Sequence, residues 1–475
     1  MSTSSITAPT YDPTTTAKAL ADKYVEGTQT KITNDTNTAT ATAKALTTLG
    51  SAISAFQTSL AGIAGIGKSM LAQSATVSDT TIGSATAKSN APAGSYSLFV
   101  SQLATSSQVS YNGLPAATPQ TGGFLTINLA DESANPVTNT AHFDVKLDAS
   151  ANTDADPNLS VREIAAAINN ASGNAGKVSA GVVTVNGVQR LVLTSTATGQ
   201  ANTVSVDATN SGDTNLTNAF ATSARTTMKS AQDAIFYLDP NDPTTKVQQA
   251  SNTFTNIDGV AFTATKAQAP GADPITLTVG RDTSGTAKNV QSFVDAYNKL
   301  KAAVDGLVSA GNPANKVAAG AFAHDSGVLA LRNRLVDLIR PAGTLSLASY
   351  GITASRDGTL SLDSTRLEKQ LTANPTGLDT LIGNASTSAP SGITGAMNTY
   401  LNQWSNTTTG QIKTRTDANT KLQSGLTQRQ SDIDSKYDAA YQRYLKQYTD
   451  LQTLQSKMQN NSSMFSSLFS NDSNS

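Results

Sequence analysis

The N-terminal part of the chain carries a heptad pattern of apolar residues. One series repeats every seven positions and consists of Val25, Ile32, Ala39, Leu46, Ile53 and Leu60. A second series, Leu49, Phe56 and Ile63, has the same interval and is offset by three. This spacing predicts a long helix with a narrow apolar seam. Since Thr28, Asp35 and Thr42 occupy the offset positions of its first half, residues 20–42 are predicted to be marginal alone and to order against a partner.

A second seam is predicted at the other end of the chain. It consists of Tyr437, Tyr441, Tyr444, Tyr448 and Leu451, at alternating steps of four and three. Leu454 and Met458 continue the pattern after a one-residue slip. Such a seam fits either an internal core helix or a coiled coil. Because the two seams lie at opposite ends of the sequence, the second interpretation pairs the termini and makes everything between them an insertion.

Between the seams, residues 79–284 mostly show the period-two alternation of β-strands. A hairpin is predicted around Asn186-Gly187, because that dipeptide suits a two-residue turn. A short helix is predicted at 159–170, where Ser160 and Glu163 form a capping box. Helical periodicity returns over residues 290–304. The predicted order is therefore helix, β region, helix-rich region and helix, an α+β multidomain fold.

Composition narrows the classes of function. Of the 475 residues, 14% are charged and the net charge is -1, so there is no basic field to attract nucleic acid. The chain has no Cys and two His, which excludes disulfides and thiolate metal sites. The N-terminus lacks the pattern of a Sec-type signal peptide, and no apolar run reaches the ~18 residues of a membrane span. Neither a cofactor nor a metal site is predicted.

One segment matches a nucleotide-binding motif. Residues 62–69 (GIAGIGKS) satisfy the phosphate-loop pattern, which requires a strand before the loop and a helix after it. Here a heptad helix precedes the loop and a Ser/Thr-rich stretch follows. A Gly-rich end of a helix is the favoured interpretation, and a nucleotide-binding enzyme using Gly62–Ser69 is the alternative from a different class.

Four segments resemble the flagellar cap protein family, also called hook-associated protein 2. These are residues 94–104 (GSYSLFVSQLA), 164–169 (IAAAIN) with 178–180, 292–298 (SFVDAYN), and 347–353 (LASYGIT) with 357–363 (DGTLSLD). They occur in the family's order and, with the terminal helices, cover nearly the whole chain. The N-terminal helix before residue 42 departs from the family in being rich in Thr.

The resemblance implies a specific domain organisation. Residues 1–42 and 425–475 would form terminal coiled-coil legs, and residues 43–78 and 285–424 a helix-rich stalk domain. Two inserted β-rich head domains would follow, the first from 79–118 and 228–284, the second nested within it at 119–227. The predicted stalk seam consists of Leu46, Leu49, Ile53, Phe56 and Leu60. The predicted terminal leg contacts are Val25, Ile32, Tyr437, Tyr441, Tyr444, Tyr448 and Leu451.

The resemblance also implies a function without catalysis. Such a protein caps the tip of the growing filament, promotes ordered flagellin polymerisation and prevents the loss of exported flagellin monomers. Its implied location is extracellular, at the flagellum tip, after export through the flagellar type III secretion apparatus. The implied partners are a ring of roughly four to six copies of itself, flagellin, the hook-filament junction protein and an export chaperone at the C-terminal helix. Another flagellar axial protein, of flagellin or junction type, and an adhesin whose heads contact host glycans stay open as alternatives.

Overall fold

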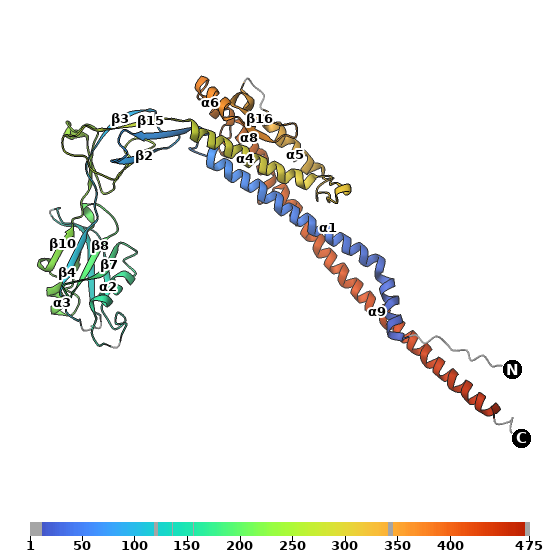
Figure 1. Ribbon diagram of the computed structural model, residues 1–475. Coiled ribbons are helices and arrows are strands. Elements are labelled where there is room, and N and C mark those ends of the chain that lie inside the picture. Colours follow the sequence, from blue (N-terminus) through green and yellow to red (C-terminus); the bar gives the residue numbers. More distant parts are fainter. Residues whose placement is uncertain (1–11, 118–121, 135, 155, 341–344, 471–475) are drawn as a thin grey trace. The chain divides into compact units, whose positions relative to one another are not determined.

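The computed structural model describes residues 12–117, 122–134, 136–154, 156–340 and 345–470 (Figure 1). The chain forms two compact units. One comprises the residues up to Met70 together with those from Ala287 onward, and the other comprises Leu71–Thr286. The first unit is built mainly from helices and the second mainly from antiparallel strands. This mixed architecture confirms the predicted α+β multidomain fold.

Two long helices from opposite ends of the sequence dominate the helical unit. Helix α1 spans Pro13–Ala64 and helix α9 spans Gln411–Ser470, and the two run side by side over most of α1 (Figure 1). The start of α1 is capped by Asp12, whose carboxylate accepts hydrogen bonds from the backbone N–H groups of Thr14 and Thr15. Pro13 occupies the first helical position, where its missing N–H costs nothing.

Shorter elements complete the helical unit. They are α4 (Thr283–Val308), α5 (Ser326–Leu338), a two-stranded ladder of β16 (Ile352–Ala354) and β17 (Leu360–Leu362), α6 (Ser364–Ala373), α7 (Gly377–Ile382) and α8 (Gly392–Ser405). Buried side chains from these elements, such as Phe293, Leu331 and Met397, form their core. Helix α8 packs against both α1 and α9.

The second unit contains two hydrophobic cores. The first is surrounded by an antiparallel sheet in the order β1-β15-β3-β11-β12 and by the ladder β13-β14-β2. Its strands are β1 (Ala72–Val77), β2 (Gly83–Ala87), β3 (Gly94–Gln102), β11 (Ala234–Tyr237), β12 (Lys246–Gln249), β13 (Thr253–Phe254), β14 (Val260–Ala264) and β15 (Ile275–Asp282). Phe236, Phe254 and Phe262 are almost completely buried in this core.

The other core is nested in the sequence of the first. Its sheets have the orders β10-β4-β8-β7 and β6-β5-β9, and α2 (Val161–Asn170) packs on β7. The strands are β4 (Gln108–Asn112), β5 (Phe124–Asp131), β6 (Thr138–Lys146), β7 (Val178–Val185), β8 (Val188–Ser195), β9 (Thr203–Asp207) and β10 (Arg225–Lys229); helix α3 spans Thr214–Ala219. Asn186 and Gly187 both have positive φ and form the turn between β7 and β8 that the sequence predicts. The capping box of Ser160 and Glu163 is also present.

The elements cross several of the predicted domain limits. Strand β1 pairs with β15, so the strand-rich unit begins at Leu71 rather than after residue 78. Strand β4 contributes Val109 and Tyr111 to the nested core, which therefore begins before residue 119. Helices α1 and α9 continue without interruption across residues 42–43 and 424–425.

Candidate functional site: the paired terminal helices

The C-terminal half of α1 carries a fully buried apolar seam. Leu46, Leu49, Ile53, Phe56 and Leu60, the residues predicted as the stalk seam, are each at most 2% exposed. They are covered by α8 and by the first part of α9, where a Cβ added at Gly50 would lie 3.8 Å from Cδ1 of Ile412. Gln57 adds hydrogen bonds of 2.8 and 2.7 Å to the side chains of Asn398 and Asn402 on α8. This end of the helix pair is therefore fixed to the rest of the unit.

A second attachment lies beside it, at Arg415 of α9. The Arg415 guanidinium makes two hydrogen bonds, of 2.6 and 3.1 Å, to the carboxylate of Asp325, which caps α5. It also lies 5.4 Å from the ring centroid of Trp404 on α8, close enough for a cation–π contact. Burial alone would raise the pKa of Asp325, but the hydrogen bonds from Arg415 and from the Val328 backbone outweigh it, so this pKa is lowered. One side chain thus connects α9 with two other helices.

Further along, polar residues pair the two terminal helices. Asn419 is 8% exposed, and its side-chain amide donates a 3.0 Å hydrogen bond to the backbone carbonyl of Ala39. The side-chain amides of Gln29 and Gln430 each donate to the other, at 2.8 Å in both directions. Both contacts depend on one alignment of the antiparallel pair, because a shift by one turn would remove them. A buried polar residue in a helical seam sets register in this way at a cost in stability.

Between these two polar contacts the helices leave a groove. It has a volume of about 530 Å3, and its floor is apolar, with Ile32 from α1 and Leu426 from α9. The walls carry neutral polar side chains: Thr33, Thr36, Asn37, Thr40, Gln423, Thr427 and Gln430. Figure 1 shows α1 curving away from α9 along this stretch and returning to it near its own start. The Thr-rich segment of α1 is therefore where the pair opens.

The two helices meet again near the start of α1, where Arg443 of α9 lies over the ring of Tyr24 of α1. The rings of Tyr437 and Tyr441 stack with centroids 6.4 Å apart, and the Arg443 guanidinium lies 4.8 Å from the ring centroid of Tyr444 and 5.9 Å from that of Tyr24. Of the predicted leg contacts, Ile32 is buried, and Val25 and the four tyrosines are half-buried. Leu451 is 40% exposed. Their role in contacting a partner stays a prediction.

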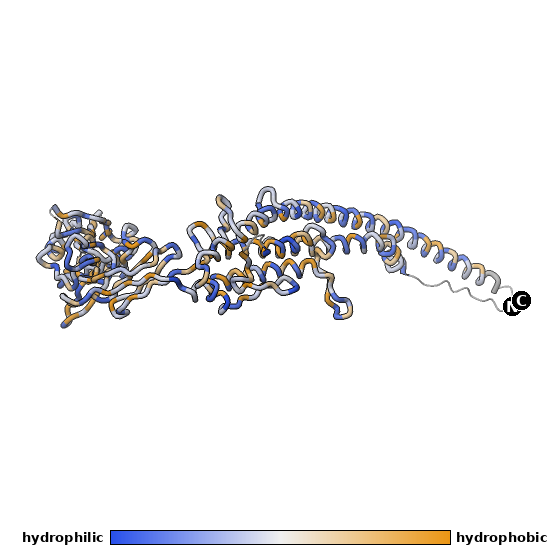
Figure 2. Tube along the Cα trace, turned by 90° about the horizontal axis from the view of Figure 1, so that it is seen from above, coloured by the Kyte–Doolittle hydropathy of each residue, from blue (hydrophilic) through white to orange (hydrophobic). Residues whose placement is uncertain are grey.

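The seam of α9 extends beyond the start of α1 without a cover among the described residues. Buried Leu426, Ile433 and Ala440 are spaced by seven, and Tyr437 and Tyr444 follow the last two at a step of four. The same alternation then reaches Leu451, Leu454, Met458 and Phe465, whose exposed fractions are 40%, 54%, 64% and 61%. In Figure 2, short orange stretches alternate with blue and white ones along the outer part of this helix. Ala440 is 3% exposed and lies deeper in the seam than half-buried Tyr441, whereas further along Tyr448 is half-buried and Gln447 is exposed.

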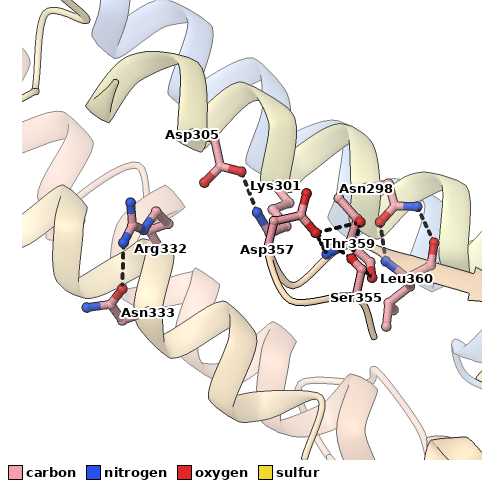
Figure 3. Close-up of polar contacts among 9 residues, drawn as sticks. All are labelled: Asn298, Lys301, Asp305, Arg332, Asn333, Ser355, Asp357, Thr359 and Leu360. Atoms are coloured by element: carbon pink, nitrogen blue, oxygen red, sulfur yellow. Dashed lines mark hydrogen bonds and ion pairs between the residues drawn. The ribbon is translucent and has the colours of Figure 1, made fainter. Parts of the chain in front are cut away.

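Two of the segments noted in the sequence contact each other in the helical unit. The side-chain amide of Asn298, on α4, donates to the carbonyl of Leu360 and accepts from its N–H, both at 2.8 Å (Figure 3). Asp357 accepts hydrogen bonds from the hydroxyl of Ser355 and from the N–H of Thr359, and these lower its pKa to about 2. The Asn298 side chain of α4 therefore pairs with the backbone of β17 in the way that a neighbouring strand would.

Gly358 explains the close packing at this turn. Its φ is +86°, and a Cβ there would lie 2.9 Å from Cγ2 of Val336 and 3.0 Å from Cε of Lys301. Lys301 is 3% exposed, and its ammonium group pairs with the carboxylate of Asp305 (Figure 3). A side chain at residue 358 would strain the backbone and displace a buried lysine stem.

The secondary-structure elements on either side of the phosphate-loop match differ from those that nucleotide binding needs. Helix α1 runs to Ala64, which is already the third residue of the match, and no strand precedes the match in the described stretch 12–71. The Asp379 carboxylate of α7 accepts hydrogen bonds from the Ser69 hydroxyl, at 2.5 Å, and from the Met70 N–H, at 3.0 Å. This segment ends a helix and attaches it to α7.

The described residues contain neither a metal-binding cluster nor a membrane-spanning helix. Those residues contain no group of three or more His, Asp or Glu side chains arranged to hold a metal ion. Among the same residues, the helices are all either too short or too polar to cross a bilayer.

The sequence interpretation missed the first half of the α9 seam. Polar residues hold three of its inward positions, Asn419, Gln423 and Gln430, so that part shows no continuous apolar pattern. The signal that could have found it is the interval of seven from Ile412 through Asn419 and Leu426 to Ile433 and Ala440.

Comparisons with known proteins agree in both sequence and structure. Two family models match, the flagellar hook-associated protein 2 N-terminus over residues 10–107 and its C-terminus over residues 231–460. The chain is 33% identical to the lateral flagellar hook-associated protein 2 of Vibrio parahaemolyticus over 383 residues, which covers 80% of this chain and 82% of that protein. It is 28% identical to the flagellar hook-associated protein 2 of Escherichia coli K12, covering 95% and 94% of the two chains.

A solved structure has the same architecture. The crystal structure of the flagellar cap protein FliD D1-D2-D3 domains from Escherichia coli superposes with a TM-score of 0.55 at 26% identity. The match covers 79% of this chain and 99% of that one. Together with the two family models, which span both parts of the helical unit and most of the first β core, it confirms the resemblance drawn from the four motifs. This chain belongs to the flagellar hook-associated protein 2 family, the cap proteins of the flagellar filament.

Proposed function

We propose that this protein caps the distal end of a flagellar filament, where it promotes ordered addition of flagellin and prevents exported monomers from being lost. The observation that carries the proposal, beyond family membership, is the helix pair. Its inner end is held by Arg415 and by the Leu46–Leu60 seam, while its outer end presents half-buried tyrosines and an uncovered apolar face. The outer end of the helix pair can become ordered when it packs against a partner's helices, and that contact then stabilises it. The role is one of assembly, as in the rest of the family, and not of catalysis.

The filament is the proposed partner of the legs. The residues assigned to it are Val25, Ile32, Tyr437, Tyr441, Tyr444, Tyr448 and Leu451, and the chemistry is that of a neutral, aromatic-rich helix surface. Tyrosine suits such contacts because it supplies apolar area together with a hydroxyl. Near them Lys446 pairs with Asp450 at 3.2 Å within α9, so these two opposite charges offset each other on the surface.

Self-assembly is the second part of the proposal. We assign to the protein a closed ring of roughly four to six copies, joined by heterologous contacts between neighbouring heads. Export through the flagellar type III apparatus places this ring outside the cell. The same C-terminal helix would be held by an export chaperone before secretion, and the hook-filament junction protein would be the ring's first neighbour. Host glycans are a proposed ligand of the exposed head loops.

Labelling at the filament tip tests the proposal. The chain has no Cys, so one cysteine placed at an exposed head residue, Thr184→Cys, can carry a gold label on living cells. We expect label at the distal end of each filament and none along its length. Label spread along the filament would instead support a flagellin, and label at the filament base would support a junction protein.

A further inference from the structure

We propose that Asp233 and the loop of residues 198–200 form a latch between the two β-rich heads, and that the nested head turns on the first head when this latch opens. The first head is the part of the strand-rich unit around the core that contains Phe236 and Phe262. The nested head is the part around the other core, which β4–β10 and α2 enclose. This inference goes beyond the proposed function and does not depend on it.

The chain passes between the two heads twice, and the two passages lie side by side. The outgoing passage follows Ala104 of the first core and reaches the nested core at Val109, and the returning one ends at Ala234 of the first core. Thr105 donates its N–H to the carbonyl of Gln232 at 2.9 Å and accepts from the Gln232 N–H at 3.3 Å. Among the described residues the two hydrophobic cores share no member. These two adjacent strands alone would therefore let one head turn on the other.

A separate contact joins the heads through the loop of residues 198–200. The Asp233 carboxylate, beside β11 of the first head, accepts a 2.8 Å hydrogen bond from the backbone N–H of Gln200 in the nested head. The Thr198 hydroxyl donates to the carbonyl of Ala250, just after β12 of the first head, at 2.5 Å. Rotation about two adjacent strands is blocked once a third point is held. The loop therefore fixes the angle between the heads.

Gly199, between those two loop residues, lies very close to the first head. Its φ is +105°, a conformation that favours glycine, and its N–H donates to the Thr105 carbonyl at 3.1 Å. A Cβ at this position would lie 2.3 Å from Cβ of Ala250 and 3.1 Å from Oδ1 of Asp233. Any side chain here would push the loop away from the first head. The residue at 199 is therefore matched to the closed latch.

Each half of the latch is also held by its own head. On the first head, the side-chain amide of Gln248, on β12, donates to the second carboxylate oxygen of Asp233 at 3.1 Å. On the nested head, the side-chain amide of Gln200 donates to the carboxylate of Asp131, at the end of β5, at 3.2 Å. Because strands hold both sides, a movement at the latch is a movement of one whole head on the other.

The latch is weak enough to open without unfolding either head. It consists of a few hydrogen bonds and the close approach of Gly199, and each hydrogen bond is exchanged for one with water when the loop moves away. Gln200 and Asp233 are both partly exposed, so water can reach the separated groups. When the latch is closed, the nested head has one orientation. When it is open, the head turns while the two passages still connect it to the first head.

Hydrogen exchange in the full chain tests the latch. The Gly199 amide is the reporter, because its own acceptor is the Thr105 carbonyl and not Asp233. Asp233→Ala removes one charge-assisted hydrogen bond, so exchange at Gly199 should become about tenfold faster. Exchange at Leu193, in strand β8 of the nested head, should stay the same, because that head remains folded. Equal exchange at Gly199 in the parent and in Asp233→Ala would overturn the proposal.

A distance measurement between the heads supplies a second readout. The chain has no Cys, so spin labels at Thr184→Cys in the nested head and Lys266→Cys in the first head report the separation by electron paramagnetic resonance. We expect one narrow distribution of distances in the parent and a second population in Asp233→Ala. A broad distribution in the parent would overturn the proposal, and so would an unchanged one in Asp233→Ala.

Two further variants separate the latch from a general effect of the charge. Asp233→Asn keeps an acceptor oxygen for the Gln200 N–H and should retain the single narrow distribution. Asp258→Ala removes an exposed carboxylate from the same head, away from the loop, and should also match the parent. A second population in Asp258→Ala equal to that in Asp233→Ala would show that the loop contact does not set the angle, and would overturn the proposal.

Discussion

Asn419 and Ala39 are 380 positions apart in sequence, and the side-chain amide of Asn419 donates a 3.0 Å hydrogen bond to the Ala39 backbone carbonyl. This contact joins the two ends of the chain at a buried position of the helix pair. It lies beside the groove, between the fixed inner end and the aromatic outer end of the legs. The alignment of α1 with α9 therefore depends on polar chemistry as well as on apolar packing.

Replacing Asn419 should loosen the legs. Asn419→Ala removes the hydrogen bond to Ala39 and should lower the free energy of unfolding of the helix pair by about 1 kcal/mol. Urea denaturation followed by circular dichroism at the helical band measures this change. Lys421→Ala, exposed on the same helix, is the control and should have little effect. An Asn419→Ala chain as stable as the parent would show that the amide does not hold the register.

Truncating a residue of the stalk seam should lower the free energy of unfolding far more than replacing Asn419 does. Ile53→Ala empties a position with no solvent exposure and should cost about 2–5 kcal/mol, since the neighbouring side chains can only partly fill the space. Ser51→Ala, on the exposed side of α1, should stay within about 0.5 kcal/mol of the parent. Thermal and urea unfolding of both variants would decide the matter. A loss for Ile53→Ala no larger than that of Ser51→Ala would show that this residue is not part of a core.

Asn298 should protect one backbone amide of the β16–β17 ladder. Its side chain is the partner of both the N–H and the carbonyl of Leu360, so Asn298→Ala leaves two polar groups unpaired, at a cost of about 1 kcal/mol. Hydrogen exchange at the Leu360 amide should become much faster. Lys299→Ala, exposed one position later, should leave that rate unchanged. Unchanged exchange in Asn298→Ala would mean that another group protects the strand.

Acid should weaken the nested head through Glu163. The backbone N–H groups of Thr153 and Ser160 hold the pKa of this carboxyl at about 2, below its ordinary 4.5. A lowered folded-state pKa means that the carboxylate stabilises the fold above pH 4.5, and that this contribution is lost as the pH falls toward 2. Unfolding experiments across this range should show a steeper decline for the parent than for Glu163→Gln, which keeps a neutral cap. Identical slopes would contradict the assignment.

The sequence predicted the parts of this protein whose patterns are local. The apolar heptads of α1, the Asn186-Gly187 turn and the Ser160 capping box each need neighbours within a few residues, and each is present. The limits of the units were harder to place. Strand β1 has little apolar alternation, and what assigns it to the strand-rich unit is its pairing with β15, about 200 positions later.

The candidate site was predicted in part, for a related reason. The tyrosines and Leu451 stand out because they are large, whereas Asn419, Gln423 and Gln430 occupy the same seam as polar residues. Their partners, Ala39 and Gln29, lie at the other end of the sequence, so a one-dimensional pattern does not reveal the pairing. The groove has no sequence signature, since it arises where the small side chains of Thr33 and Thr36 meet Leu426.

Flagellin released into the growth medium is the most direct measure of the central claim. The gene for this chain is deleted, cells are removed, and ultracentrifugation separates filaments from monomer. A cap predicts soluble monomeric flagellin and cells without filaments, with filaments restored when the intact gene is returned. Normal filaments with no released monomer would contradict capping and would favour an adhesive or accessory role for the protein.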